Sequence, residues 1–327
     1  MNTLDQPVSN PVLIPRAEHA ISRANISESA LKVLYRLKQA GHEPYLVGGG
    51  VRDLLLGREP KDFDVATDAS PEQVQALFRN CRLIGRRFRL AHVHFGRDIV
   101  EVATFRAAHE ERHALAQTEN GRILRDNVYG TLEQDAFRRD FTVNALYYDI
   151  RDFSIVDYVD GMADLRAGQL RLIGDPDQRY REDPVRMLRA ARFAAKLGFR
   201  LHADTERPIA ALAPLLADIP PARLFEEILK LFLYGFGAQA FEVLRRLGLF
   251  APLFPRTEAA LRLEEEGFPH VFISRALAST DARVAQARPV TPAFLFAALL
   301  WEPVRQRAAA LQASGAHPSD AYRDAAY

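Results

Sequence analysis

Two aspartates separated by one residue are the most chemically suggestive feature of the sequence. They lie in the segment Lys61-Asp62-Phe63-Asp64, which we predict to run along a strand. Because side chains two residues apart on a strand share a face, Asp62 and Asp64 would project together while Phe63 enters the core. Adjacent carboxylates favour a divalent cation, and two Mg²⁺ ions about 3.5 to 4 Å apart are usual for in-line phosphoryl transfer. A solvated strand edge would explain the same pattern.

A third carboxylate lies on another predicted strand. Glu101 is flanked by Val100 and Val102, which would face the core, so its own side chain would face the other way. That side of a sheet is ordinarily exposed to solvent. If this strand neighbours the strand of the paired aspartates, Asp62, Asp64 and Glu101 would share one face and form a metal site.

A glycine-rich turn precedes the paired aspartates. Gly48-Gly49-Gly50 stands between a predicted strand and a predicted helix. Flexible backbone, a helix N-terminus and the guanidinium of Arg52 together suit a triphosphate. The segment is neither a Walker loop nor a Gly-x-Gly-x-x-Gly motif. A tight turn, with Arg52 and Asp53 in a surface ion pair, is the alternative.

The second half of the chain has one comparable feature. Asp183 and Pro184 are a favourable N-cap and first residue for a helix on which arginines recur every three positions, at Arg186, Arg189 and Arg192. An aspartate and an arginine one turn apart offer an acceptor and donors to a base edge. A capped helix with a solvated arginine stripe would look the same.

Residues 79–97 carry basic side chains and no acidic ones. The arginines are Arg79, Arg82, Arg86, Arg87, Arg89 and Arg97. Such a stretch near a metal site predicts contact with phosphate oxygens of RNA or a triphosphate, and a solvated basic face is the alternative. His92 and His94 alternate on a predicted strand, but no third metal ligand lies in register with them.

The elements that must position these residues differ between the two halves. Strand and helix patterns mix up to Asp183, and strand patterns nearly vanish after it. The predicted strands are 45–47, 63–67, 92–95, 99–104 and 155–158, and the predicted helices include 71–78, 185–197, 223–233 and 238–247. The polar stretch 107–127 is predicted to be a mobile loop. We therefore expect an α+β fold in which a small mixed sheet precedes helical domains.

Composition limits the class of protein. The 327 residues are 48% hydrophobic, enough for two or three structural units, and a formal charge of +1 excludes binding of nucleic acid through bulk charge alone. A single cysteine, Cys81, excludes an internal disulfide and suggests a reducing compartment. The most apolar stretch, 293–301, is about half of the ~20 residues that span a bilayer. We expect a soluble cytoplasmic protein without a membrane partner.

Five ordered motifs resemble the bacterial class II tRNA nucleotidyltransferase and poly(A) polymerase family over about residues 16–305. They are GGVRD at 49–53, KDFDVAT at 61–67, EVATFR at 101–106, RRDFTVNA at 138–145 and REDPVR at 181–186. The resemblance implies a nucleotidyltransferase head with a small mixed β-sheet, followed by all-helical neck and body domains. The implied domains are a flexible leader at 1–26, the head at 27–150, a base-recognising neck at 151–215 and an RNA-binding body at 216–327.

The resemblance also implies residue roles. Asp62 and Asp64 would hold catalytic Mg²⁺, Glu101 would support it, and Asp140 would be a further active-site acid near the ribose. Other residues would contact the triphosphate, the ribose and the base of the substrate ATP. The whole predicted nucleotide-binding set is Gly49, Gly50, Arg52, Arg139, Asp183, Arg186 and Arg189.

Two enzymes of the family remain to be separated. Residues 13–27 are similar to the leader of the bacterial enzymes that add adenylates to RNA, which the CCA-adding enzymes lack, and residues 221–230 and 291–298 favour the same choice. We expect transfer of AMP from ATP to RNA 3′ ends with release of pyrophosphate. CCA addition to tRNA and non-catalytic RNA binding are the alternatives. Family members extend past Tyr327 into further helices and a basic tail, so we expect this chain to bind RNA more weakly. The resemblance implies no protein partner.

Overall fold

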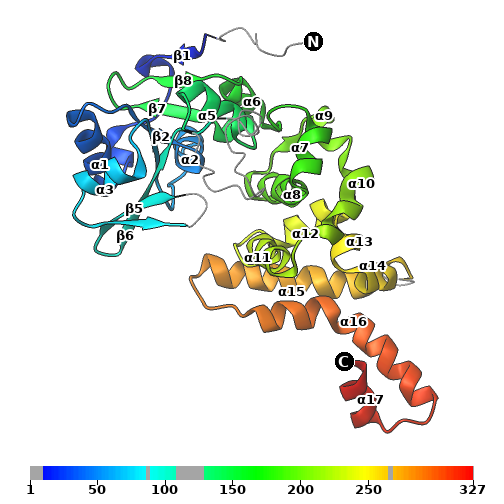
Figure 1. Ribbon diagram of the computed structural model, residues 1–327. Coiled ribbons are helices and arrows are strands. Elements are labelled where there is room, and N and C mark those ends of the chain that lie inside the picture. The colour runs from blue at the N-terminus through cyan, green and yellow to red at the C-terminus, as the bar shows by residue number, and fades with distance from the viewer. Residues whose placement is uncertain (1–9, 86–88, 108–128, 264–267, 327) are drawn as a thin grey trace, which may run out of the picture. The chain divides into compact units, whose positions relative to one another are not determined.

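The computed structural model describes residues 10–85, 89–107, 129–263 and 268–326 (Figure 1). The chain forms two compact units, Met1–Gly174 and Asp175–Tyr327. The first contains the β-sheet and the second is helical, so the predicted α+β class is confirmed. The expected boundary between neck and body at residue 216 stays a prediction.

The first unit is built on a mixed eight-stranded sheet, in the order β1-β8-β7-β2-β3-β6-β5-β4. The β3–β6 pair is parallel, and the other six neighbouring pairs are antiparallel. The strands are β1 (Val12–Ile14), β2 (Pro44–Val47), β3 (Asp64–Thr67), β4 (Cys81–Ile84), β5 (Leu90–Phe95), β6 (Asp98–Thr104), β7 (Leu146–Asp149) and β8 (Ile155–Asp157), with a short β9 (Gln169–Leu170) outside this sheet.

The helices of this unit begin where local capping chemistry predicts. Ser27 accepts a hydrogen bond from the backbone N–H of Ala30 at the start of α1, and Ser70 and Gln73 form a capping box at the start of α3. The α-helices are α1 (Glu28–Gln39), α2 (Gly49–Leu55), α3 (Pro71–Leu77), α5 (Leu132–Arg138) and α6 (Gly161–Ala167), and the 3₁₀ helices are η1 (Arg16–Glu18), η2 (Arg23–Asn25) and η4 (Thr142–Asn144).

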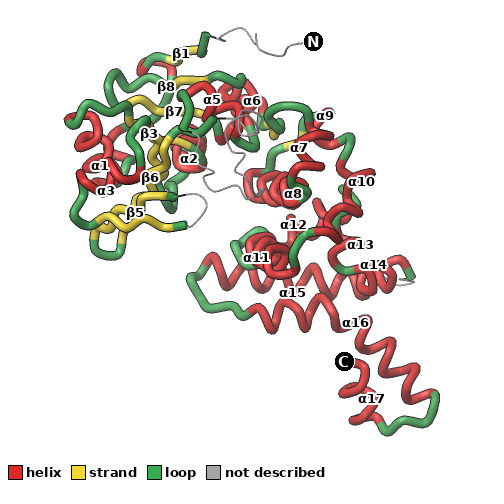
Figure 2. The backbone as a smooth tube through the Cα atoms, in the orientation of Figure 1, coloured by secondary structure: helices red, strands yellow, loops and turns green. Residues whose placement is uncertain are grey.

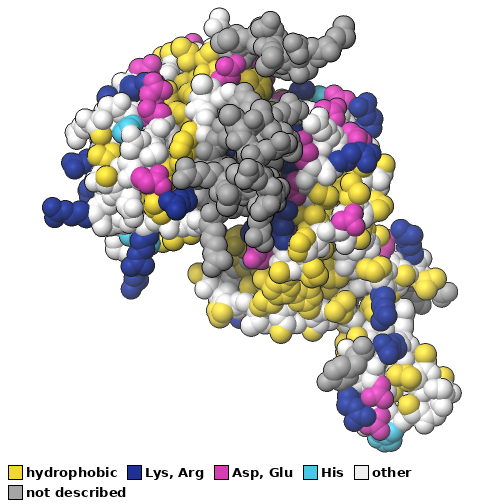
Figure 3. Space-filling view, viewed as in Figure 1, with side chains coloured by type: hydrophobic (Ala, Val, Ile, Leu, Met, Phe, Trp, Pro, Cys, Tyr) yellow, Lys and Arg dark blue, Asp and Glu magenta, His cyan; other side chains and the backbone are white. Residues whose placement is uncertain are grey.

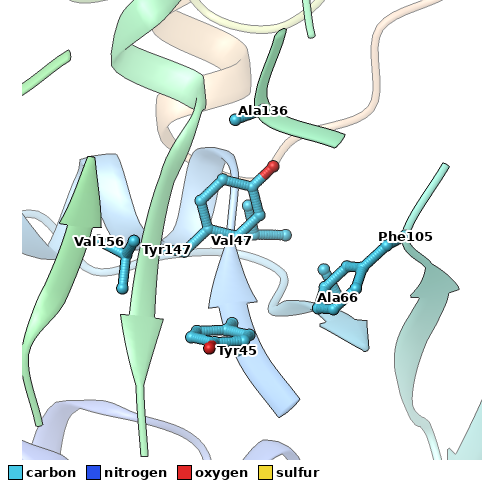
Figure 4. Packing of buried hydrophobic residues seen from close by; sticks show 7 residues of the cluster. All are labelled: Tyr45, Val47, Ala66, Phe105, Ala136, Tyr147 and Val156. Carbon is cyan, nitrogen blue, oxygen red and sulfur yellow. The ribbon is translucent and has the colours of Figure 1, made fainter. Parts of the chain in front are cut away.

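A cluster of buried side chains supports the centre of the sheet (Figure 4). Tyr45 and Val47 alternate along β2 and face the same side, where the Tyr147 ring of β7 packs edge-on against Tyr45 with centroids 6.1 Å apart. The other members are Ala66, Phe105, Ala136 and Val156. Because Tyr147 and Ala136 belong to β7 and α5, this core fixes the sheet to the segment that carries the RRDFTVNA motif.

The first unit departs from the expected domain limits at both ends. Val12–Ile14, expected in a flexible leader, pairs antiparallel with β8, and Ile21 is fully buried, so that expectation is wrong for this part of 1–26. The pairing joins residues more than 140 positions apart, which local patterns cannot indicate. Strand β8 belongs to the same sheet, so the head unit continues past residue 150 to Gly174. The loop expected at 107–127 lies, apart from Ala107, outside the described residues.

The second unit is almost entirely helical in its described residues (Figure 2). Its elements are α7 (Pro176–Glu182), α8 (Val185–Leu197), β10 (Arg200–Leu201), α9 (Ala203–Glu206), α10 (Ile209–Leu212), η5 (Ala213–Asp218), α11 (Pro221–Phe232), α12 (Gly237–Arg246), α13 (Phe250–Leu253), α14 (Pro255–Arg262), α15 (Phe268–Ala285), α16 (Pro292–Ala313) and α17 (Pro318–Ala325). On the face shown in Figure 3, hydrophobic side chains gather over the region of α15. Within the described ranges, no helix combines the length and apolarity needed to cross a membrane.

The start of α8 is shifted by one residue from the prediction. Pro184 takes the N-cap position, and Asp183 is the last residue of the preceding turn. The Asp183 carboxylate still accepts a hydrogen bond from the backbone N–H of Val185, at 3.3 Å. It therefore contributes to capping from one position further out.

Candidate active site

The register of the sheet brings two of the expected acids together. Asp64 is the first residue of β3, and it lies directly opposite Glu101 of β6 in the parallel pair. Asp62 is in the loop before β3 and not on the strand, because the strand begins at Asp64. The prediction that both aspartates lie on the strand is therefore wrong for Asp62, whereas the predicted neighbourhood of the Asp64 and Glu101 strands is correct.

Glu101 and Asp62 both act electrostatically on Asp64, but the three acids do not form a complete metal-binding site. Asp64 loses hydration to the surrounding protein although it keeps an exposed surface, and this desolvation, followed by the charges of Glu101 and Asp62, raises its pKa to about 6. Among the described residues, no group of three or more His, Cys, Asp or Glu side chains is arranged to hold a metal ion. The expected set of Asp62, Asp64 and Glu101 is thus not assembled as such.

Asp62 also faces different surroundings from its two companions. A cavity of about 750 Å³ in the first unit is lined by Asp62 together with Arg58, Lys61 and Arg97. Asp64 and Glu101 are not part of its lining. This cavity therefore brings Asp62 together with basic side chains and not with the other two acids.

The glycine turn passes close to Asp64. Gly48 has a φ of 76°, which is favourable for glycine, and a Cβ atom there would lie 3.5 Å from Asp64 Oδ2 and 3.8 Å from Arg139 Nη1. A Cβ atom on Gly50 would lie 3.2 Å from the carbonyl oxygen of Asp62. Glycine is therefore favoured at position 48 by its backbone conformation and at position 50 by the tight contact with the Asp62 carbonyl.

Arg139 is held in place by partners that sequence reasoning missed. Its guanidinium donates to Asp135 Oδ2 from Nε at 3.1 Å and from Nη2 at 2.9 Å, and it also donates to the Tyr147 hydroxyl at 2.8 Å. Burial by itself would raise the pKa of Asp135, but Arg139, Arg138 and the Tyr147 hydroxyl outweigh it and lower the pKa. The buried Asp135 carboxylate, one helical turn before Arg139, thus anchors this arginine near the glycine turn.

Arg52 is buried and not at the surface. Only 1% of the residue is exposed; Nε and Nη2 donate to Asp53 Oδ1 at 2.9 and 2.7 Å, and Nη1 donates to Asn144 Oδ1 at 2.6 Å. Asn144 in turn donates to Asp140 Oδ1 at 3.4 Å. The surface ion pair left open by the sequence is therefore wrong. A triphosphate contact by Arg52 stays a prediction, and it would require one of these bonds to be exchanged.

The expected base-recognising residues belong to the second unit and are engaged with neighbours. Asp183 accepts a hydrogen bond from Arg223 Nη2 at 2.7 Å. Arg186 Nη1 donates to the Arg179 carbonyl at 2.6 Å and to Glu182 at 3.1 Å. Arg189 lies on the same helix and is half-buried. Binding of a base by Asp183 and Arg186 would therefore replace bonds that already exist.

The basic stretch lies at the β4 edge of the sheet and in the turns beside it. Arg79, Arg82, Arg89 and Arg97 are exposed, whereas Arg86 and Arg87 lie outside the described residues. Arg89 forms an ion pair with Glu72 at 2.8 Å. Exposure of most of this stretch fits both alternatives, phosphate contact and a solvated face.

Comparison with known proteins now adds to this geometry. The Poly A polymerase head domain family matches residues 44–171, and the family described as "Probable RNA and SrmB- binding site of polymerase A" matches 198–261. Poly(A) polymerase I of Escherichia coli O6:H1 is 55% identical over 325 residues, which covers 97% of this chain and 70% of that protein. Poly(A) polymerase I of Haemophilus influenzae is also 55% identical, over 95% of this chain and 70% of its own length.

More distant similarity extends to enzymes that act on tRNA. The CCA-adding enzyme of Geobacillus stearothermophilus is 39% identical over 72% of this chain and 57% of its own length. The crystal structure of the Bacillus stearothermophilus CCA-adding enzyme in complex with CTP matches with a TM-score of 0.63 at 30% identity, over 91% of this chain and 80% of that chain. The predicted nucleotidyltransferase head is thereby confirmed, and the chain belongs to the poly(A) polymerase family.

Proposed function

We propose that this protein is a polynucleotide adenylyltransferase, which adds AMP from ATP to the 3′-hydroxyl of RNA without a template and releases pyrophosphate. The observation that carries the proposal is the 55% identity to poly(A) polymerase I over nearly the whole chain. The Asp64–Glu101 pair beside the glycine turn supplies the chemistry that such an activity requires.

The acids fit a hard divalent cation. All three of Asp62, Asp64 and Glu101 offer oxygen donors, which suit Mg²⁺. Desolvation, followed by the negative charge of Glu101, raises the pKa of Asp64, and a bound cation would favour the ionised carboxylate. In this proposal Asp64 and Glu101, paired in register, hold the metal, and Asp62 adds negative charge from the loop before β3. When bound, Mg²⁺ supplies positive charge to the reacting phosphate and lowers the pKa of the attacking hydroxyl.

The glycine turn and the RRDFTVNA motif position the nucleotide in this proposal. Gly49 and Gly50 give the triphosphate access to backbone N–H groups at the start of α2. Arg139, fixed by Asp135 and Tyr147, faces the ribose together with Asp140. Arg52 of α2 donates a hydrogen bond to Asn144. This bond links the glycine turn, which binds the triphosphate in this proposal, to the RRDFTVNA segment, which binds the ribose.

The second unit selects the base and grips the RNA in this proposal. Asp183 and Arg186 recognise adenine once they exchange their bonds to Arg223 and Glu182, and Arg189 adds positive charge on the same helix. The exposed arginines of 79–97 contact RNA phosphates. The cytoplasmic location expected from the single Cys81 remains part of the proposal.

A product assay separates this function from its alternatives. The protein is incubated with Mg²⁺ and either an unstructured RNA or a tRNA that lacks its terminal CCA, with each nucleotide supplied separately. We expect long adenylate tails on the unstructured RNA with ATP and little incorporation of CTP. Three-nucleotide products confined to the tRNA would favour CCA addition instead. RNA binding without any nucleotide incorporation would favour a non-catalytic RNA-binding protein.

A further inference from the structure

Four residues from four neighbouring strands stand in one row across the sheet. The registers pair Asp64 of β3 with Glu101 of β6, Glu101 with His92 of β5, and His92 with Arg82 of β4. Residues directly opposite each other in neighbouring strands share a face. His92 and Arg82 therefore lie on the same face of the sheet as the candidate acids Asp64 and Glu101.

Glu101 lies between two chemically different neighbours in this row. On one side is Asp64, whose carboxylate has the same charge and whose pKa Glu101 helps to raise. On the other side, His92 Nε2 lies 3.4 Å from Glu101 Oε2. Repulsion from Asp64 alone would let the Glu101 side chain swing away from the site. Its side chain is 43% exposed, so packing does little to prevent that movement.

The His92 backbone is firmly placed. Its neighbours Ala91 and Val93 are fully buried, opposite Val102 and Val100 of β6. The imidazole itself is only 25% exposed. A ring on such a strand has few available directions, so its Nε2 atom gives Glu101 a defined polar neighbour.

We propose that His92 is a positioning residue for Glu101. It engages one oxygen of the carboxylate and thereby keeps the other available to the acid site beside Asp64. The inference rests on the proposed function, because it assigns Glu101 to the metal site of the adenylyl transfer. Partners of metal-binding side chains commonly change metal affinity or activity by about 10- to 100-fold when removed.

The neighbouring histidine provides a matched control. His94 projects on the same face of β5, opposite Ile99 of β6 rather than an acid. Within the described part of the chain, its Nε2 atom is buried and has no hydrogen-bond partner. Its backbone pairs with Asn80, and a side-chain substitution leaves that pairing possible.

The test compares His92→Ala, His92→Gln and His94→Ala in the full chain. Three quantities are measured: Mn²⁺ affinity by electron paramagnetic resonance without nucleotide or RNA, kcat and KM for ATP, and the thermal unfolding midpoint. We expect His92→Ala to weaken Mn²⁺ binding and lower kcat by about tenfold, with little change in KM for ATP. The amide of Gln can replace Nε2, so His92→Gln should recover most of both losses, and His94→Ala should leave both at the wild-type values.

Three results would overturn the proposal. They are wild-type kcat and Mn²⁺ affinity in His92→Ala, an equal loss in His94→Ala, and a rise in KM for ATP alone. If His92→Ala unfolds at a lower temperature, His92→Leu replaces it, because Leu keeps volume without a donor. A wild-type protein that adds no adenylate would refute the proposed function instead, and the Mn²⁺ measurement would still decide the role of His92.

Discussion

The two units of this chain bring their candidate functional residues together in different ways. In the first unit, Gly48, Asp64, Glu101 and Arg139 come from four separate segments, and sheet register and core packing place them. In the second unit, Asp183 and Arg186 are one helical turn apart, and each bonds to a different neighbour. We infer that reaction rate depends on the fixed framework of the first unit, whereas base choice depends on exchangeable ion pairs in the second.

Removing a buried anchor should break the framework most severely. Asp135→Ala removes the buried carboxylate that accepts two hydrogen bonds from Arg139, and the loss of one partner of such a pair costs about 3 to 5 kcal/mol. We expect a fall of that size in the free energy of unfolding, measured by urea denaturation, with loss of activity. Asp177→Ala, which removes an exposed pair with Arg181, should change stability by less than about 1 kcal/mol. Equal effects of the two variants would contradict the assignment.

Two glycines with positive φ separate backbone strain beside the acids from backbone strain elsewhere. Gly48 and Gly57 both have positive φ, at 76° and 68°, and a Cβ atom on Gly57 would meet nothing within 4 Å. Alanine at either position should cost about 1 to 2 kcal/mol of stability. Only Gly48→Ala should also lower kcat for adenylate addition, because the strained turn lies beside Asp64 and Arg139. A Gly57→Ala enzyme with the same kinetic defect would show that strain alone is responsible.

The second unit should affect selectivity more than rate. Arg186→Ala removes a donor proposed to recognise adenine, and we expect the preference for ATP over CTP to fall by about tenfold, or 1.4 kcal/mol. A four-nucleotide competition on one RNA primer measures this ratio. Arg181→Ala, an exposed arginine of α7 paired with Asp177, serves as the control. Unchanged selectivity in Arg186→Ala would rule out its role in base recognition.

The smallest expected effect is a gain of stability at the acid site. The folded-state pKa of Asp64, about 6, lies above its ordinary value of 3.8, so ionisation destabilises the fold as pH rises through this window. Asp64→Asn without metal should therefore be more stable than wild type at pH 8, by up to about 1 kcal/mol after allowance for solvent exposure, and show no such gain at pH 4. Denaturation curves at both pH values test this. A gain of the same size at pH 4 would point to packing instead.

Local chemistry made much of the fold predictable. The patterns of 71–78 and 185–197 placed α3 and α8 within about two residues. Strand β4 and helix α5 were missed, because their short segments have weak periodicity.

The site was predictable in composition but not in arrangement. The motifs identify Asp64, Glu101 and Arg139, and the i,i+4 spacing of Asp135 and Arg139 is compatible with their ion pair. No local pattern shows that Arg52 is buried against Asn144. His92 was set aside for want of a ligand in register, and the register in fact pairs it with Glu101. Contacts of this kind arise from strand pairing, so they appear only once the sheet is formed.

The most direct test of the central claim is the rate of adenylate addition by Asp64→Asn. Wild type and variant are compared on a labelled unstructured RNA with ATP and Mg²⁺, after circular dichroism has shown the same folded structure. We expect a loss on the order of 10³-fold or more, because the carboxylate charge that would hold the cation at the reacting phosphate is gone. Adenylate tails formed at a rate within a few fold of wild type would contradict it.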